Sequence, residues 1–375
     1  MTQLTPQRPS ALAFDHWLVI SVLAIMAMGV LMVTSASMVI SAKQYGNSFH
    51  YAVHQLLYLF MGISVALVVL RVKMETWERI SPWLVLVSFI LLLAVLVPGI
   101  GRSVNGSRRW INLLVINVQV SEVVKLCMIL FMSGYLIRRQ KDVSTTIGGF
   151  LRPMGLIGVM GLLLLLEPDF GATVVIMATA LSLLFLAGMR FRHFAGLLLI
   201  VAIAMAVLAI SSPYRLQRLT TFLNPWARQF DSGYQLTQSL IAFGRGGWTG
   251  VGLGESIQKL FYLPEAHTDF LFAVLAEELG FVGEMVVLGL FSFLVYRILR
   301  IGRRAHRINQ VFAAFCCYGF ALWIAFQVMI NIGVCSGVLP TKGLTLPFMS
   351  YGGSSLMVMC VVIAIVLRVD SESRQ

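Results

Sequence analysis

Long apolar runs recur along the whole chain and are separated by short polar stretches. An α-helix crosses the ~30 Å hydrocarbon core of a bilayer in about 20 apolar residues, and the runs have about that length. We therefore expect an all-α polytopic membrane protein that forms a single transmembrane domain over residues 1–375. Ten transmembrane helices are predicted, at residues 17–39, 51–71, 81–100, 120–138, 153–167, 170–189, 194–212, 269–299, 310–332 and 354–368.

The distribution of Lys and Arg predicts the orientation. With the N-terminus in the cytoplasm, seventeen of these cations fall in cytoplasmic segments and five in the short outer loops. Short cytoplasmic loops carry the excess of positive charge in membrane proteins. Both termini are therefore expected in the cytoplasm, with residues 1–16 as a tail. The first apolar run is too long for a signal-peptide core and is interpreted as a retained anchor.

Two outer segments differ from ordinary short loops. Residues 213–268 form a long periplasmic loop, in which the apolar spacing of Gln235–Phe243 predicts an amphipathic helix lying in the membrane interface. Residues 333–353 are rich in Pro, Gly and hydroxyl side chains, which is typical of a re-entrant segment facing protein or water. The glycine-rich stretch 244–254 does not fit the G-x-G-x-x-G pattern, so we assign no nucleotide site to it.

The composition narrows the class further. The chain is 58% hydrophobic and 12% charged, which excludes a soluble enzyme, a disordered protein and a coiled coil. Its net charge of +12 is attributed to the positive-inside bias and to anionic lipid, not to nucleic acid. The five cysteines form neither a disulfide framework nor a thiolate metal site.

Ionisable residues within the apolar runs are candidates for function, because each is costly in lipid. Glu122 and Lys125 are three residues apart and share a helix face. They form either a neutralising pair that fixes helix packing or the wall of a polar cavity, with Lys125 facing an anionic headgroup. Arg109, just before them, is either an interfacial anchor or a phosphate clamp.

Two acidic clusters lie at outer ends of predicted helices. Asp169 is well explained as a helix N-cap, and Glu167 less well. Glu265, His267 and Asp269 are three titratable groups within five residues, at a depth that suits a reaction on a lipid headgroup. The alternative is that Thr268 or Asp269 merely caps the eighth helix.

Together these residues resemble the SEDS family (shape, elongation, division and sporulation), and most closely its division branch. The resemblance covers nearly the whole chain. It rests on the motifs at 108–111, 119–125, 167–173, 263–270, 273–280 and 339–355. One departure is Val120, where the family commonly has Pro.

The resemblance implies a peptidoglycan glycosyltransferase of the bacterial inner membrane, concentrated at the division septum, that polymerises lipid II. Asp269 would be the general base on the acceptor 4-hydroxyl, with polyprenyl pyrophosphate as the leaving group. A leaving pyrophosphate needs no protonation, so one carboxylate suffices. The expected substrate-binding residues are Arg109, Glu122, Lys125, Glu167, Asp169, Arg215, Lys259, Glu265, His267, Lys342 and Ser350.

Partners and alternatives follow from the same resemblance. The expected partners are lipid II, a class B penicillin-binding transpeptidase of the FtsI type, and division proteins like FtsQ, FtsL, FtsB and FtsN, but no nucleic acid.

No cofactor is assigned, although a divalent cation is an alternative holder of the pyrophosphate charge. A lipid II flippase and a non-catalytic division scaffold are the alternative functions. Glu277 and Glu284, deeper in the eighth helix, favour the flippase.

Overall fold

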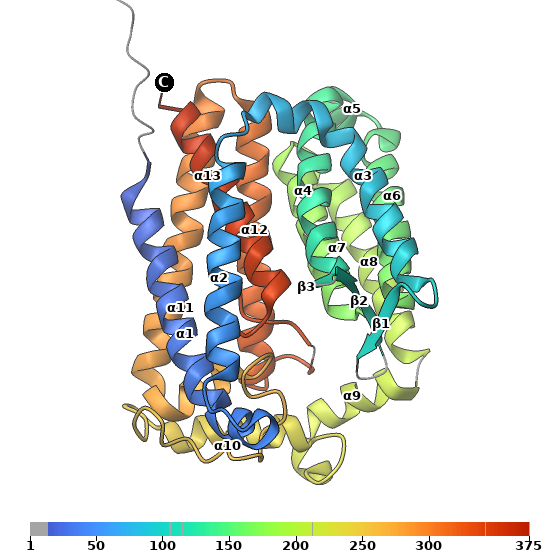
Figure 1. Cartoon of the computed structure of the whole chain (residues 1–375). Helices are drawn as coiled ribbons and strands as arrows, with labels where there is room; N and C mark the ends of the chain where they lie inside the picture. The colour runs from blue at the N-terminus through green and yellow to red at the C-terminus, as the bar shows by residue number, and fades with distance from the viewer. Residues whose placement is uncertain (1–13, 105–106, 114–115, 212, 342, 375) are drawn as a thin grey trace, which may run out of the picture.

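The computed structural model describes residues 14–104, 107–113, 116–211, 213–341 and 343–374. Within these ranges most of the chain is helical, and the long helices lie side by side in one bundle (Figure 1). The helices are α1 (His16–Tyr45), α2 (His50–Val69), α3 (Met74–Leu96), α4 (Val120–Arg138), α5 (Gln140–Thr145), α6 (Ile147–Leu166), α7 (Phe170–Leu186), α8 (Phe191–Ile210), α9 (Pro213–Leu223), the 3₁₀-helix η1 (Pro225–Arg228), α10 (Tyr234–Gly246), α11 (Leu271–Arg307), α12 (Val311–Cys335) and α13 (Gly353–Glu372).

Each predicted apolar range overlaps one of these helices, although the range 81–100 extends beyond α3, which ends at Leu96. Among the residues that the structure describes, eight helices are long and apolar enough to cross a membrane. The shorter apolar helices Phe170–Leu186 and Phe191–Ala204 lie where the sixth and seventh crossings are predicted. The prediction of a helical multi-pass membrane protein is confirmed, whereas the number of ten crossings and the orientation stay predictions.

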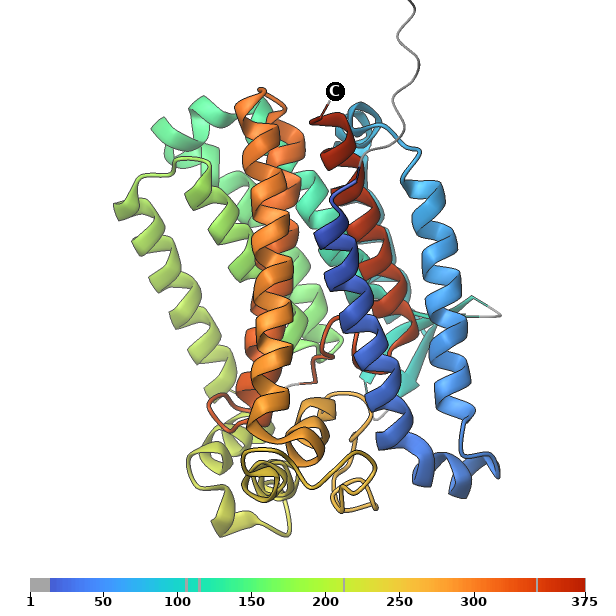
Figure 2. The same cartoon turned by 90° about the vertical axis from the view of Figure 1, so that its left-hand side faces the viewer.

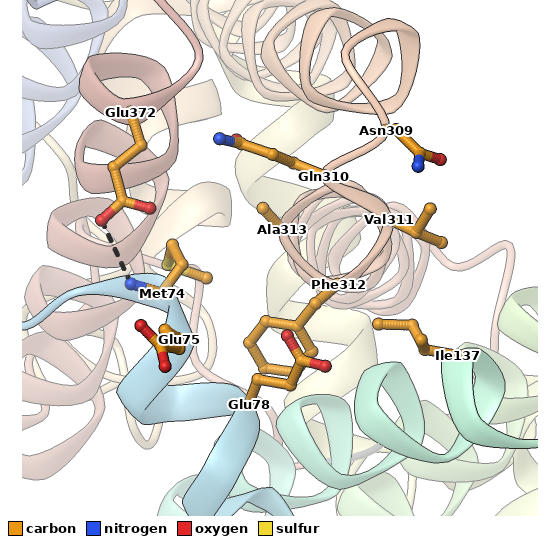
Figure 3. A pocket seen from close by; sticks show the side chains of 10 residues that line it. All are labelled: Met74, Glu75, Glu78, Ile137, Asn309, Gln310, Val311, Phe312, Ala313 and Glu372. Atoms are coloured by element: carbon orange, nitrogen blue, oxygen red, sulfur yellow. Dashed lines mark hydrogen bonds between the residues drawn. The ribbon is translucent and has the colours of Figure 1, made fainter. Parts of the chain in front are cut away.

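The start of α1 and the end of α13 lie at the same end of the bundle, which we call the terminal end (Figure 1). Acidic side chains at this end join helices to one another, as Asp15 and Glu372 show. Asp15 caps α1 by accepting the Leu18 N–H at 3.0 Å, and it pairs with Arg297 of α11. Glu372 accepts the N–H of Met74 at 3.2 Å and so joins α13 to the start of α3 (Figure 3).

The opposite end, which we call the loop end, carries α9 and α10 (Figure 1). The predicted amphipathic helix is present as α10, and it lies across this end of the bundle (Figure 1). Its placement in a membrane interface stays a prediction. The described residues of the segment 336–352 lie in the same half of the molecule and are irregular, and most of those from 344 to 350 are buried.

The central helices are α4, α12 and α13. In their most apolar windows, 72–78% of the residues are buried, against 17–22% for α2, α3 and α11. The side chains buried between helices include Trp323, Phe320 and Met128, so the core lies around α4 and α12. The polar residues of α4 and α12 must therefore find partners inside the protein.

One element departs from the expected all-α fold. Residues 101–119 contain a three-stranded antiparallel sheet of β1 (Gly101–Val104), β2 (Ser107–Leu113) and β3 (Ile116–Gln119) in the order β1-β2-β3. Trp110 pairs with Arg102 on one side and with Gln119 on the other. The sheet leads directly into α4, so it fixes the start of the helix that carries Glu122 and Lys125.

The helix α11 is broken at Gly280, whose φ of 62° is outside the helical region. The glycine-rich stretch pairs with the break, because the Val251 N–H donates to the Glu277 carbonyl at 3.0 Å and the Phe281 N–H donates to the Gly247 carbonyl at 3.0 Å. A Cβ at Gly280 would lie 2.3 Å from the nitrogen of Gly250. The glycines of this stretch therefore allow a close approach between main chains.

Candidate active site

A group of buried polar side chains links α4 to α12. The Lys125 Nζ lies 2.8 Å from Glu122 Oε1 and donates to Gln327 Oε1 at 2.9 Å. The Trp323 Nε1–H donates to the same Gln327 oxygen at 2.8 Å. Lys125 is only 1% exposed and Glu122 only 3%. The predicted i,i+3 pair is therefore present, and Gln327 is a partner of it that the sequence did not reveal.

Gln327 and Asn331 lie one turn apart on α12 and hold the segment 336–352. The Gln327 Nε2 donates to the Thr345 carbonyl at 2.9 Å. The Asn331 Nδ2 donates to the Leu344 carbonyl at 2.6 Å and to the Asp269 carbonyl at 2.8 Å. These bonds hold the main chain of Asp269 and of residues 344–345 against α12, the helix that Lys125 also contacts.

Asp269 is half-buried and lies just before α11. The N-cap residue of α11 is Phe270, whose side chain makes no capping hydrogen bond. The expectation that Thr268 or Asp269 caps it is therefore wrong, and the Thr268 hydroxyl instead donates to Glu265 Oε2 at 2.6 Å. A Cβ on Gly343 would lie 3.0 Å from Asp269 Oδ2, so the carboxylate is close to the Gly343 main chain.

His267 lies beside Asp269 in a group of aromatic rings. Its ring centroid is 4.6 Å from that of Tyr51 and 5.7 Å from that of Tyr351. The main-chain carbonyl of His267 also accepts the Tyr351 N–H at 3.0 Å. Burial lowers the pKa of His267, and the nearby Glu265 opposes this shift. The imidazole is therefore held toward its neutral form.

The turn between α6 and α7 carries two buried carboxylates. Asp169 accepts the Ala172 N–H at 3.2 Å, which confirms the predicted cap of α7. Glu167 is fully buried, and among the described residues neither of its carboxylate oxygens has a hydrogen-bond partner. Burial and the neighbouring Asp169 raise the pKa of Glu167 to about 8, against the opposing effect of Arg109. The side chain of Glu167 therefore favours its protonated form.

Arg109 comes from β2 and reaches the same turn. Its Nε–H donates to the Glu167 carbonyl at 3.1 Å, and its terminal NH₂ donates to the Pro168 carbonyl. This contact ties the sheet to the end of α6, a role that neither earlier interpretation of Arg109 included. Arginine has five N–H donors, so the guanidinium has further donors beyond these two bonds.

Two other predicted residues have partners elsewhere in the protein. The Lys259 Nζ pairs with Glu278 Oε1 at 2.7 Å and donates to the Ser35 hydroxyl at 2.9 Å, so it joins the long loop to α11 and α1. Ser350 accepts the Leu346 N–H at 2.9 Å and closes a turn within the segment 336–352. The structure does not group Lys259 with Asp269.

The structure gives no side-chain position for the remaining two predicted residues. Lys342 lies outside the described residues, and for Arg215 only the main chain, within α9, is described. Throughout the described ranges, no group of three or more His, Cys, Asp or Glu side chains is arranged to hold a metal ion.

These features define a class: a multi-pass helical membrane protein with a buried polar group that connects an intramembrane ion pair to a carboxylate at the loop end. The family described as cell cycle protein, with the members FtsW, RodA and SpoVE, matches residues 15–375. The chain belongs to this family.

The chain is similar to several known proteins over nearly its whole length. It is 60% identical over 361 residues to a Coxiella burnetii protein named "Probable peptidoglycan glycosyltransferase FtsW", and the match covers 96% of this chain and 97% of that protein. A Legionella pneumophila protein of the same name is 56% identical over 367 residues, covering 98% and 93%. A solved structure of a peptidoglycan synthase complex contains a chain that is 30% identical with a TM-score of 0.81, covering 97% of this chain and 100% of that one.

Proposed function

We propose that this chain is a peptidoglycan glycosyltransferase that polymerises lipid II into glycan strands during septal wall synthesis. The observation that supports this most directly is the arrangement of Asp269. It is a half-buried carboxylate at the loop end, the N-cap position of the following helix belongs to Phe270, and Asn331 fixes the main chain of Asp269. The relatives named as peptidoglycan glycosyltransferases match nearly the whole chain.

In this proposal Asp269 takes the proton of the acceptor 4-hydroxyl as the oxygen attacks the anomeric carbon of the donor. Polyprenyl pyrophosphate leaves with the bonding electrons and needs no proton, because it is a stable anion. The energy of the reaction comes from the donor. Positive charge at the pyrophosphate stabilises the transition state.

We assign the positive charges that bind the pyrophosphate to Arg109, Arg215 and Lys342. Lys125 is a weaker candidate for direct contact, because Glu122 and Gln327 already engage its buried ammonium group. We propose that Lys125 acts by positioning Gln327, which holds the Thr345 main chain. The carboxyl of Glu167, in its protonated form, is proposed to donate a hydrogen bond to substrate.

The flippase alternative loses one of its two supporting residues. The Glu277 carboxylate accepts from Arg245 at 2.7 Å and from the N–H groups of Ile257 and Gln258. Glu277 thus anchors the glycine-rich stretch to α11, and a proton carrier would have to break these bonds. We retain the transferase as the proposed function.

A transpeptidase partner is part of the proposal. The solved chain with a TM-score of 0.81 comes from a peptidoglycan synthase complex that coordinates polymerisation and crosslinking. We propose that the single transmembrane helix of a class B penicillin-binding protein packs on α11 or α12, of which α11 has the more exposed surface. The terminal end is assigned to the cytoplasm and the loop end to the periplasm.

The experiment is a polymerisation assay with labelled lipid II on the purified chain together with its transpeptidase. Asp269→Asn keeps the shape of the side chain but removes its basicity, so activity should fall by about 10²- to 10⁴-fold. Asp231→Asn, at an exposed position of the same long loop, is the matched control and should change nothing. Activity of Asp269→Asn within a few fold of wild type would refute the assignment. Loss of lipid II translocation with intact polymerisation would favour the flippase.

A further inference from the structure

Four arginines line an open surface hollow of about 340 Å³ near the terminal end of α11. All its lining residues come from this one helix. They are Tyr296, Leu299, Arg300, Arg303, Arg304 and Arg307. Successive separations of three and four residues place Arg300, Arg303 and Arg307 on one face of the helix.

Three of these guanidinium groups carry uncompensated charge. Arg304 pairs with Asp370 of α13 at 2.6 Å. Among the residues that the structure describes, Arg300, Arg303 and Arg307 form no ion pair with any carboxylate. The face therefore presents three positive charges that nothing in the described chain neutralises.

The same face becomes apolar toward the middle of α11. Tyr296 is 52% exposed and Phe293 is 37% exposed. One turn further, a Cβ added to Gly289 would meet nothing within 4 Å, so the surface has a notch beside Phe293. The terminal-end half of α11 lies at the front of the bundle in Figure 2. Charge, an amphipathic tyrosine and an apolar notch thus follow one another along one surface.

We propose that this surface binds one anionic phospholipid. Arg300, Arg303 and Arg307 would hold the headgroup phosphate, because the guanidinium fork matches phosphate oxygens in a bidentate manner. An acyl chain would lie along Phe293 and the notch at Gly289, with Tyr296 at the boundary between headgroup and hydrocarbon. Clusters of Lys and Arg immediately on the cytoplasmic side of a transmembrane helix bind the anionic headgroups of the cytoplasmic leaflet.

The test is native mass spectrometry of the purified full chain in detergent, titrated with dioleoylphosphatidylglycerol or dioleoylphosphatidylcholine. We expect one tightly bound phosphatidylglycerol and at least tenfold weaker binding of the zwitterionic lipid. The triple variant Arg300→Gln, Arg303→Gln, Arg307→Gln should lose on the order of 100-fold in affinity, because each cation near an anionic headgroup contributes about fivefold. Equal binding of both lipids, or an unchanged affinity in the triple variant, would overturn the proposal.

Two further variants separate the site from general electrostatics and from misfolding. Arg190→Gln with Arg192→Gln removes two exposed cations near the start of α8 and should leave phosphatidylglycerol binding unchanged. Replacing the three α11 arginines by Lys keeps the charge and should retain affinity within about tenfold of wild type. A loss as large in the Arg190 and Arg192 variant as in the Gln triple variant would contradict a specific site. Inorganic phosphate that displaces the lipid at equal concentration would contradict the acyl contact.

Discussion

The side-chain amide of Asn331 donates to the main-chain carbonyl of Asp269 at 2.8 Å, across 62 residues of sequence. The same nitrogen donates to the Leu344 carbonyl at 2.6 Å. One side chain of α12 therefore fixes two segments that meet at the candidate site. The position of the proposed base depends on the packing of α12 and not only on its own turn.

Replacing Asn331 by Leu should reduce lipid II polymerisation more than it reduces stability. The substitution removes the amide donor of two main-chain carbonyls, of which that of Asp269 keeps only the weak Cys335 thiol at 3.6 Å, at a cost of about 1–3 kcal/mol. A displacement of Asp269 by about 1 Å would lower turnover by about 100-fold. Polymerisation and thermal unfolding measured on the same preparation test this. The exposed Asn112→Ala is the control, and normal turnover in Asn331→Leu would disprove the positioning role.

Gly343→Ala should disturb the Asp269 carboxylate directly. The added Cβ would lie 3.0 Å from Asp269 Oδ2, which is closer than ordinary van der Waals contact. We expect turnover to fall by about tenfold with little change in the unfolding temperature. Gly155→Ala adds the same methyl group into open space on α6 and should leave turnover unchanged. If the two variants behave alike, the carboxylate does not depend on this contact.

The ion pair of Glu122 and Lys125 should behave as a coupled unit in stability. Lys125→Met alone leaves a buried carboxylate without its partner, so we expect a loss of about 3–5 kcal/mol. Adding Glu122→Gln should recover more than half of this loss, because a buried pair is often replaceable by neutral groups. Unfolding of the two variants in detergent measures the difference. Additive losses would show that the two groups do not interact.

The stability of the protein should depend on pH through Glu167. Its pKa is raised to about 8 in the folded state, from an ordinary value of 4.5, so the folded chain binds more protons between these values. Stability should therefore fall as pH rises from about 4.5 to about 8 and then level off. Unfolding temperatures of wild type and Glu167→Gln over this range isolate the effect. The variant should lose this part of the slope and be the more stable protein at pH 9, and parallel curves would rule out the shift.

The positions of the helices could be predicted from the sequence because the bilayer fixes the length of an apolar run. The predicted range 120–138 matches the bounds of α4. The amphipathic spacing of Gln235–Phe243 likewise indicated α10. Both patterns are local, so they need no knowledge of neighbouring helices.

Contacts across the bundle could not be predicted in this way. Gln327 meets Lys125 only because α12 packs against α4, and nothing in the spacing of either helix specifies that pairing. Lys259 was predicted to bind substrate, but its ammonium group forms an ion pair with Glu278. The sheet had a usable signal that was missed: the dipeptide Asn105-Gly106, which favours a tight hairpin between flanking strands.

The break at Gly280 has a consequence for the order of assembly. An interrupted helix exposes main-chain N–H and C=O groups, which are costly in hydrocarbon. Here the partners of these groups come from residues 247–252, which leave the ribosome before α11 does. The paired residues 247–252 and 277–282 are close in sequence, so closing the loop between them costs little entropy. The main-chain groups at the break can thus form their hydrogen bonds as α11 emerges, before α12 and α13 are synthesised.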